Sequence, residues 1–465
     1  MKILLVIPPN SQEERYGKFS SIGTLYPPLG LAYIAAVLEK NNFEVRVVDS
    51  EAMNYSYSDV EQIIKRFNPD VVGMSVYFNT INRCYKVAER IKKINPHIKI
   101  VLGGAQVTLD PNLVKDKNID FGIYGEGEIS FRNLIKAIEN HLTVSKVNGL
   151  IWKKANKIII NKPQRLVENL DELPMPARHL FPMSKYHSSA NLRGKRTLNI
   201  MTSRGCPYKC TYCAGSLIFG GTYRYHSTDR VIEELKELKE KYGADDIQFY
   251  DETFTANKKR VIDLCNKIIK NKLNIEWSCF TRVNLVDPEL LKKMKQAGCY
   301  QIFYGLESGV QRLLNLIKKG ITLEQSRRAM KWTHEAGIET WVSFMMGLPT
   351  ETKQESEQTI KFALEVDPNF VQFPITTPYP GTEMYDLAKK NGKFLTDNWD
   401  DYTAWDVVFV SNGRTPEEIR ETVSKAYRAF YLRPSYMIRR IKSVFKLPLT
   451  KIISLFKSAI FAFLN

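Results

Sequence analysis

The 465-residue sequence has little cysteine and shows no internal repeat or low-complexity tract. Outside one close group, its seven Cys stand singly in segments of regular periodicity: Cys84, Cys265, Cys279 and Cys299. This distribution excludes a disulfide framework and favours a reducing, cytoplasmic compartment. The first apolar run, Ile3 to Ile7, is short and stops at Pro8 and Pro9 with no small-residue cleavage site. We therefore expect a buried first strand there rather than a signal peptide.

Acidic residues are the minority among the charged residues. Lys and Arg total 67 against 50 Asp and Glu, which gives a formal charge of +17. Such a balance favours anionic partners: phosphates, nucleic acid or an anionic membrane surface. Many Lys fall on exposed faces of predicted helices, so a solvated surface explains the charge equally well. With 44% hydrophobic and 25% charged residues, the chain has the composition of a globular protein of two or three domains.

Residues 1–142 alternate β-rich runs with helical periodicity. The runs KILLVI, FEVRVVD, VVGMSVY, IKIVLGG and FGIYG are separated by predicted helices near residues 29–41, 60–67 and 81–94. This alternation predicts an α/β domain with a doubly wound, Rossmann-like parallel sheet. A ligand is then expected at the carboxyl ends of the strands, where the chain places several glycines.

The rest of the chain divides into three further regions. Residues 143–192 combine a short apparent hairpin with a Pro-rich stretch, which we interpret as a linker. In residues 193–400, six β-rich runs alternate with Lys- and Glu-rich helical segments, which predicts a partial (β/α)6 TIM-like barrel with its chemistry at the C-terminal strand ends. Residues 401–465 predict a helical C-terminal extension with a basic amphipathic tail.

One loop carries the strongest chemical signal. Cys206, Cys210 and Cys213 follow directly on a predicted strand with the spacing C-x3-C-x2-C. Three thiolates can hold a [4Fe–4S] cluster and leave one iron open for a chelating ligand with an amine and a carboxylate. The alternatives are unligated core cysteines or a zinc site with His226 as fourth ligand. No second C-x2-C pair supports zinc.

This motif, in its strand-to-helix position, resembles the radical S-adenosylmethionine (SAM) superfamily. The resemblance implies a [4Fe–4S] cluster that cleaves SAM to methionine and a 5′-deoxyadenosyl radical. It also implies SAM contacts at successive strand ends, for the amino group, the carboxylate, the ribose and the adenine: Asp251, Glu252, Arg282, Glu307, Ser308 and the backbone at Gly347. An ion pair for Arg282 and a helix cap for Glu307 remain simpler alternatives.

The doubly wound domain before the barrel indicates one family within this superfamily. Together with the segments YPPLGLAYIAAVLE, GGAQVTLDP, GEGE and TPYPGTEMY, it is similar to the cobalamin-dependent radical SAM family over nearly residues 1–430. The resemblance implies cobalamin contacts at Gly103, Gly104, Thr108, Gly125, Glu126, Gly127 and Glu128. The stretch Asp49–Asn54 has no His, so the cofactor is expected base-off without a protein imidazole.

The family resemblance implies a methyltransferase that acts on an unactivated carbon, with a low-potential electron donor such as flavodoxin or ferredoxin. The apolar stretch beyond Pro448, described below, favours a hydrophobic or lipid-like substrate. An oxidative cyclase or ring-rearranging enzyme, as for tetrapyrroles, is the main alternative. A tRNA methylthiotransferase needs three more cysteines, but residues 1–200 contain only Cys84, and no RNA-binding appendage follows, so nucleic acid is not expected as a partner. A non-enzymatic cobalamin sensor would need an output module, and none is recognisable.

The C-terminal stretch from Arg433 to Asn465 mixes basic residues with Ile, Leu, Val and Phe. Lys451 and Lys457 interrupt the apolar part, so an interfacial amphipathic helix fits better than a membrane-spanning one. For residues up to about 440, a helix packed on the barrel is an equal alternative. We therefore expect a cytoplasmic enzyme with peripheral contact at the inner face of the membrane.

Overall fold

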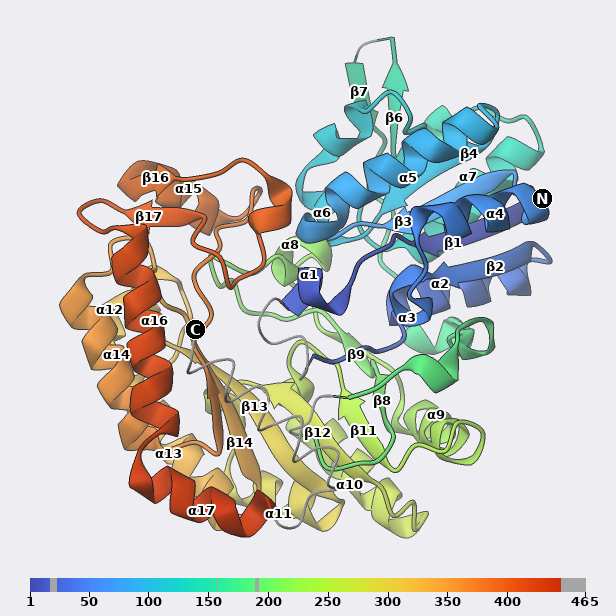
Figure 1. Cartoon of the computed structure of the whole chain (residues 1–465). Coiled ribbons are helices and arrows are strands. Elements are labelled where there is room, and N and C mark those ends of the chain that lie inside the picture. Colours follow the sequence, from blue (N-terminus) through green and yellow to red (C-terminus); the bar gives the residue numbers. More distant parts are fainter. Residues whose placement is uncertain (17–22, 156, 189–191, 445–465) are drawn as a thin grey trace.

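The computed structural model describes residues 1–16, 23–155, 157–188 and 192–444. Two α/β units follow each other along the chain, and a mainly helical C-terminal part packs beside the second unit (Figure 1). The tail beyond residue 444, for which we expect membrane contact, lies outside the described residues. Among the helices of the described ranges, none is long and apolar enough to cross a membrane.

The first unit is built on a seven-stranded sheet. Its strands are β1 Lys2–Ile7, β2 Glu44–Asp49, β3 Val71–Ser75, β4 Lys99–Gly103, β5 Phe121–Ile123, β6 Leu150–Lys154 and β7 Lys157–Ile160. The order across the sheet is β2-β1-β3-β4-β5-β6-β7, and β1 to β5 run parallel. The five predicted parallel strands and the Rossmann-like fold class are therefore confirmed.

Helices cover both faces of this sheet because alternate residues of each strand point to opposite sides. Leu5 of β1 belongs to the core shared with the helices α2 (Leu29–Lys40) and α7 (Gly127–Glu139), whereas Val6 belongs to the core shared with two others, α4 (Tyr57–Phe67) and α5 (Ile81–Ile94). The central strand β3 is apolar and buried, as expected for a strand covered on both faces, whereas the edge strand β2 exposes Glu44 and Arg46.

The β6–β7 hairpin, which we expected to be part of the linker, belongs instead to the N-terminal sheet. Both strands are antiparallel, and β6 pairs with β5 through Phe121↔Trp152 and Ile123↔Leu150. Leu150 and Ile151 are fully buried in the cores of the first unit. The hairpin therefore completes the N-terminal sheet, because its alternating apolar residues cover an edge that three-residue β5 would leave open.

The second unit contains six parallel strands, as predicted. They are β8 Thr197–Ile200, β11 Asp246–Phe249, β12 Glu276–Thr281, β13 Cys299–Glu307, β14 Glu339–Phe344 and β15 Phe370–Gln372. Each pairs with its neighbour in chain order, from β8 to β15, which gives the expected partial barrel. The outer helices are α9 Thr228–Glu240, α10 Lys258–Lys270, α11 Pro288–Gln296, α12 Gln311–Leu316, α13 Leu323–Glu335 and α14 Lys353–Val366.

The C-terminal part adds a short helix, a hairpin and two longer helices. These are α15 Glu383–Asn391, β16 Gly392–Phe394, β17 Phe409–Ser411, α16 Pro416–Tyr431 and α17 Pro434–Val444. Helix α16 packs along α14 on the outside of the barrel (Figure 1). Thr415 caps α16 in a capping box with Glu418, and Pro416 occupies its first turn, so the sequence itself specifies where this helix begins.

Candidate functional site

The cysteine loop leaves the barrel at the end of β8. A two-residue strand, β9 (Ser203–Arg204), pairs antiparallel with β10 (Arg224–Tyr225), and the loop then leads into the short helix α8 (Gly215–Ile218). Gly205 adopts φ +87, and a Cβ there would lie 2.1 Å from Thr222 O. Only glycine allows this close crossing, which turns the three cysteines toward the strand ends.

The three thiols share a common space. Cys206 Sγ lies 3.3 Å from Thr253 Oγ1, Arg282 Nη1 donates to Cys210 Sγ at 3.4 Å, and Gly215 N donates to Cys213 Sγ at 3.4 Å. Burial raises the pKa of the Cys213 thiol, and the charges of Cys210 and Cys206 raise it further. Thiols that interact in this way, two of them with an N–H donor at 3.4 Å from sulfur, fit the ligand set of a [4Fe–4S] cluster.

His226 does not complete a zinc site with these cysteines. Its Nδ1 lies 3.0 Å from Asp171 Oδ1, its Nε2 lies 3.4 Å from Tyr33 Oη, and burial lowers its pKa to about 4. Both ring nitrogens are therefore engaged. Across the described ranges, no group of three or more His, Cys, Asp or Glu is arranged to hold a single metal ion.

Asp251 and Glu252, the residues expected to bind the SAM amino group, lie beside the cysteine loop. Asp251 is buried and accepts from Thr202 N and Thr202 Oγ1, both at 2.6 Å, and from Ser203 Oγ at 2.7 Å. It therefore holds the turn that starts the loop. Glu252 accepts from Gly205 N at 3.1 Å, and burial together with the Asp251 charge raises its pKa to about 7.

Arg282 and Glu307 contact the loop from the next strands. The Arg282 guanidinium lies 3.7 Å from the centre of the Tyr208 ring in addition to its contact with Cys210. Glu307 accepts from Tyr212 Oη at 2.8 Å and from Lys319 Nζ at 2.7 Å. Neither tyrosine was expected from the sequence to take part in the site, because the only signal of each is its position between two cysteines.

Ser308, in contrast, turns away from the loop. Its Oγ lies 3.2 Å from Thr359 Oγ1 of α14 and accepts from Val310 N at 3.1 Å. The Thr359 hydroxyl also accepts from Gly309 N at 3.1 Å. These contacts fasten the end of β13 to the outer helix, so a role of Ser308 toward SAM remains a prediction only.

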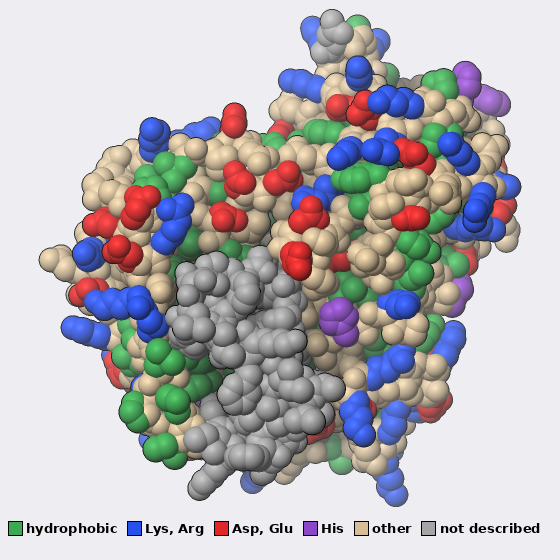
Figure 2. All heavy atoms as spheres, in the orientation of Figure 1, with side chains coloured by type: hydrophobic (Ala, Val, Ile, Leu, Met, Phe, Trp, Pro, Cys, Tyr) green, Lys and Arg blue, Asp and Glu red, His purple; other side chains and the backbone are tan. Residues whose placement is uncertain are grey.

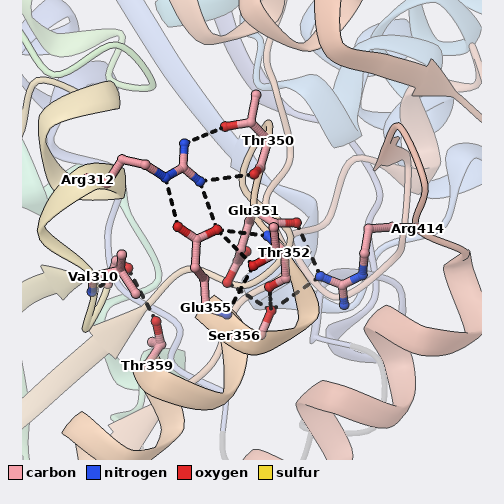
Figure 3. A network of polar contacts seen from close by, with 10 residues as sticks. Val310, Arg312, Thr350, Glu351, Thr352, Glu355, Ser356, Thr359 and Arg414 are labelled. Carbon is pink, nitrogen blue, oxygen red and sulfur yellow. Dashed lines mark hydrogen bonds and ion pairs between the residues drawn. The ribbon is translucent and has the colours of Figure 1, made fainter.

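Gly347 begins a loop that a dense polar network holds in place (Figure 3). Gly347 has φ +77, and Thr350 also adopts a positive φ. Arg312 donates to Thr350 O and Oγ1, each at 3.0 Å, and to both carboxylate oxygens of Glu355 at 2.8 Å. Buried Glu351 accepts from Leu348 N at 2.7 Å, and burial raises its pKa to about 7. The network ties this loop to α12, which carries Arg312, and to α14, which carries Glu355.

A cavity of about 350 Å³ lies between the two units. The first unit lines it at the carboxyl ends of its strands, and the barrel lines it with residues that include Arg204 and Glu252. Six of the seven residues expected to contact cobalamin line it: Gly103, Gly104, Gly125, Glu126, Gly127 and Glu128. No histidine is among the described residues that line the cavity.

Thr108, the seventh, ties two of the lining turns together. Its Oγ1 donates to Gly104 O at 3.2 Å and accepts from Gly125 N at 3.0 Å. A Cβ added at Gly125 would have no neighbour within 4 Å, and at Gly103 only Ile123 Cβ, at 3.9 Å. Open space above these glycines fits a large planar cofactor that approaches the backbone closely.

Buried ion pairs cross the cavity between the two units. Arg204 pairs with Glu128 at 2.6 Å and with Glu126 at 3.2 Å, and Arg224 pairs with Glu126 at 2.6 Å. All four side chains are less than 10% exposed. Arg204 lies two residues before Cys206, so the GEGE turn of the first unit is bound directly to the start of the cysteine loop.

Comparisons with known proteins agree with both halves of this arrangement. The family model of the radical SAM superfamily matches residues 200–363, and that of the B12 binding domain matches residues 19–135. The chain is 41% identical over 443 residues to the uncharacterized methyltransferase PH0819 of Pyrococcus horikoshii, which covers 95% of each chain. It is 27% identical to the anaerobic magnesium-protoporphyrin IX monomethyl ester cyclase of Rubrivivax gelatinosus, with 89% of this chain and 75% of the cyclase covered.

The fold is also similar to that of a solved structure. The structure of the radical SAM methyltransferase TsrM from Kitasatospora setae, with cobalamin and a [4Fe–4S] cluster bound, matches with a TM-score of 0.71 at 18% identity and covers 93% of this chain and 89% of TsrM. Both units thus have counterparts in known proteins, with matches over nearly the whole chain. The chain belongs to the cobalamin-binding radical SAM enzymes.

Proposed function

We propose that this enzyme transfers a methyl group to an unactivated carbon of an apolar substrate. The observation that carries the proposal is the shared cavity: the turns expected to hold cobalamin and the start of the cysteine loop line the same space. When bound, the cluster supplies the electron that cleaves SAM, and cobalamin supplies the methyl group. The similarity to a methyltransferase at 41% identity supports this reading.

The chain's own residues have two proposed tasks. They position the cluster and SAM, and they help to exclude water. Cys206, Cys210 and Cys213 are proposed to hold three irons, while Arg282 and Glu252 lie where they can meet the carboxylate and the amino group of SAM. The ion pairs of Arg204 tie the two units together at the cavity wall, which would help to keep water from the reacting groups. Each of these assignments rests on position beside the loop.

A row of aromatic side chains supports an apolar substrate. Four rings cross the barrel strands in contact: Tyr250 and Phe280 have centroids 5.5 Å apart, Phe280 and Phe303 5.1 Å, and Phe303 and Trp341 5.3 Å. Rings at these separations form one continuous apolar surface.

The row faces the inside of the barrel. Tyr304 bonds to Thr333, and Thr340 bonds to His334, both on the outer helix α13. Because neighbouring residues of a strand point to opposite faces, Phe303 and Trp341 must point inward. A substrate that enters the barrel from this side would meet the aromatic row below the cysteine loop.

Membrane contact is a further proposal about where such a substrate is found. Leu432, Met437 and Ile438 are exposed at the end of α16 and on α17, just before the apolar, basic C-terminal stretch. Figure 2 shows hydrophobic side chains at the lower left, where Figure 1 places these helices. Deletion of residues 447–465 is expected to move the enzyme from the membrane to the soluble fraction. An unchanged distribution would contradict the contact.

The basic surface is expected to attract the low-potential electron donor, a flavodoxin or ferredoxin, that reduces the cluster. On the visible face, Lys and Arg are interspersed with Asp and Glu and do not form one stripe (Figure 2). This pattern suits transient association better than binding along a nucleic acid.

The proposed function is tested by anaerobic reconstitution, with analysis of iron, sulfide and cobalt, followed by mass spectrometry of products. S-adenosylhomocysteine and 5′-deoxyadenosine in equal yield support methyl transfer. Formation of 5′-deoxyadenosine alone would instead support the cyclase alternative, for which the similarity to the Rubrivivax cyclase speaks. Cys213→Ala should abolish 5′-deoxyadenosine without loss of cobalt binding. Protein that binds no cobalt would overturn the assignment of the first unit.

A further inference from the structure

Lys319 is a buried cation beside the cysteine loop. Its side chain is 6% exposed, and its Nζ lies 2.7 Å from Glu307 Oε1 and 3.1 Å from Tyr212 Oη. The Tyr212 hydroxyl donates to the same Glu307 oxygen at 2.8 Å. Lysine is rarely buried unless it is paired, so this closed triangle of three polar side chains is a built feature rather than a surface contact.

The triangle connects the cysteine loop to the end of strand β13. Tyr212 lies between Cys210 and Cys213, and Glu307 ends β13 with φ +63, a left-handed conformation that is uncommon for a residue with a side chain. A Cβ at Gly305 would lie 2.2 Å from Glu307 Oε1 and 2.9 Å from Lys319 Nζ. The strand therefore carries a glycine where the pair needs room.

The backbone near Lys319 holds the same loop. Thr211 N donates to Ile317 O at 3.0 Å, and the guanidinium of Arg282 donates both to Lys319 O and, at 3.4 Å, to Cys210 Sγ. Lys319 is itself placed by the end of α12, where its N–H donates to Leu314 O at 2.9 Å. Side chain and backbone thus fasten the loop from two directions.

We propose that Lys319 is a positioning residue that docks the cysteine loop on β13 and whose charge favours the reduced [4Fe–4S] cluster. This inference rests on the proposed cluster at Cys206, Cys210 and Cys213. A positive charge in a buried site is poorly screened and stabilises an electron added nearby. The charge and hydrogen bonding around a cluster are among the features that set its reduction potential.

The test compares Lys319→Met with Lys318→Met. Lys318 is the matched control, because it is the neighbouring lysine but is 56% exposed and pairs with Glu383 on the surface. Both variants are reconstituted anaerobically as full chains, and iron and sulfide are measured per chain. The midpoint potential is measured by dithionite titration with electron paramagnetic resonance, without SAM or cobalamin.

We expect the midpoint of Lys319→Met to fall by at least 59 mV, which is a tenfold weaker reduction for one electron, or its iron content to fall below half of the wild-type value. Lys318→Met should match the wild type. A Lys319→Met protein with wild-type iron and midpoint overturns the inference. Wild-type protein without a cluster overturns the proposed function and this inference together.

A second variant decides the matter if Lys319→Met does not fold, as judged by circular dichroism. Glu307→Gln keeps the shape of the triangle but removes the negative charge that offsets Lys319. Its midpoint should therefore rise, opposite in sign to the effect at Lys319, because the ammonium charge is then uncompensated. An unchanged or lower midpoint in Glu307→Gln would contradict the proposed role of the charge.

Discussion

The ion pairs between the two units allow a quantitative prediction for Arg204→Met. Arg204 and Glu128 have side chains that are each 5% exposed, and the variant leaves the Glu128 carboxylate buried without its partner. Breaking a buried pair in this way costs about 3–5 kcal/mol of unfolding free energy. Glu126 keeps Arg224 at 2.6 Å, so the loss should come mainly from Glu128.

A double variant separates the charge from the packing. Arg204→Met combined with Glu128→Leu replaces the pair by apolar side chains, and such replacements are often nearly neutral. The double variant should therefore recover most of the stability lost in the single one, with a coupling energy of about 2 kcal/mol or more in the double-mutant cycle.

Urea denaturation of the apo protein measures these differences, followed by tryptophan fluorescence and far-UV circular dichroism, and a two-state fit is valid where the two curves coincide. Arg327→Met is the control, because the Arg327–Glu365 pair is 42% and 50% exposed and should be worth less than about 1 kcal/mol. If Arg204→Met costs no more than Arg327→Met, the ion pairs do not hold the two units together.

Three further predictions concern pH and the cavity. The pKa of Glu252 is about 7 in the folded chain, so the unfolded chain binds fewer protons between pH 4.5 and 7, and the unfolding free energy falls as pH rises through that window. Glu252→Gln should remove up to about 3 kcal/mol of this fall, seen by denaturation at pH 5 and 7.5. The Arg312 guanidinium holds the pKa of Glu355 at about 2; the stability from this pair is present above pH 4.5 and lost as pH falls toward 2. Arg312→Met should therefore be less stable than wild type at pH 7 by about 1 kcal/mol, and the difference should shrink in strong acid to what the hydrogen bonds to Thr350 contribute. Gly103→Leu projects into open space at the cavity wall, and in equilibrium dialysis it should bind cobalamin at least about tenfold more weakly while its iron content stays the same; unchanged cobalt binding would place the cofactor elsewhere.

Much of the fold follows from local sequence patterns. Continuous apolar runs bounded by turn residues predicted the parallel strands of both units, and the observed β13, Cys299–Glu307, falls within two residues of the run YQIFYGLESG. There are two exceptions. Strand β17 lies in the region expected to be helical, and the second exception is the β6–β7 hairpin. Its apolar alternation was visible, but nothing local shows that it pairs with β5, because an antiparallel edge depends on which strand is left uncovered.

Only those parts of the site that carry a sequence motif could be predicted. The cysteine spacing and the glycine turns identified the loop and the cavity wall, whereas Lys319 is one of two adjacent lysines and belongs to no motif. The pairing of Glu126 and Glu128 with Arg204 spans more than 70 residues of sequence. Such contacts arise from the docking of two units, so they cannot be predicted from the periodicity or spacing of residues within either unit.

Because β6 and β7 come after the last helix of the first unit, the N-terminal sheet is completed late during translation. The last helix of that unit, α7, ends at Glu139, but the sheet is complete only when Ile160 has been made. Until then, β5 offers an unpaired edge of three residues to any other chain nearby. Lys157 then places a charge on β7, the finished edge strand, so this side of the sheet stays unpaired only for the time the ribosome takes to add one hairpin.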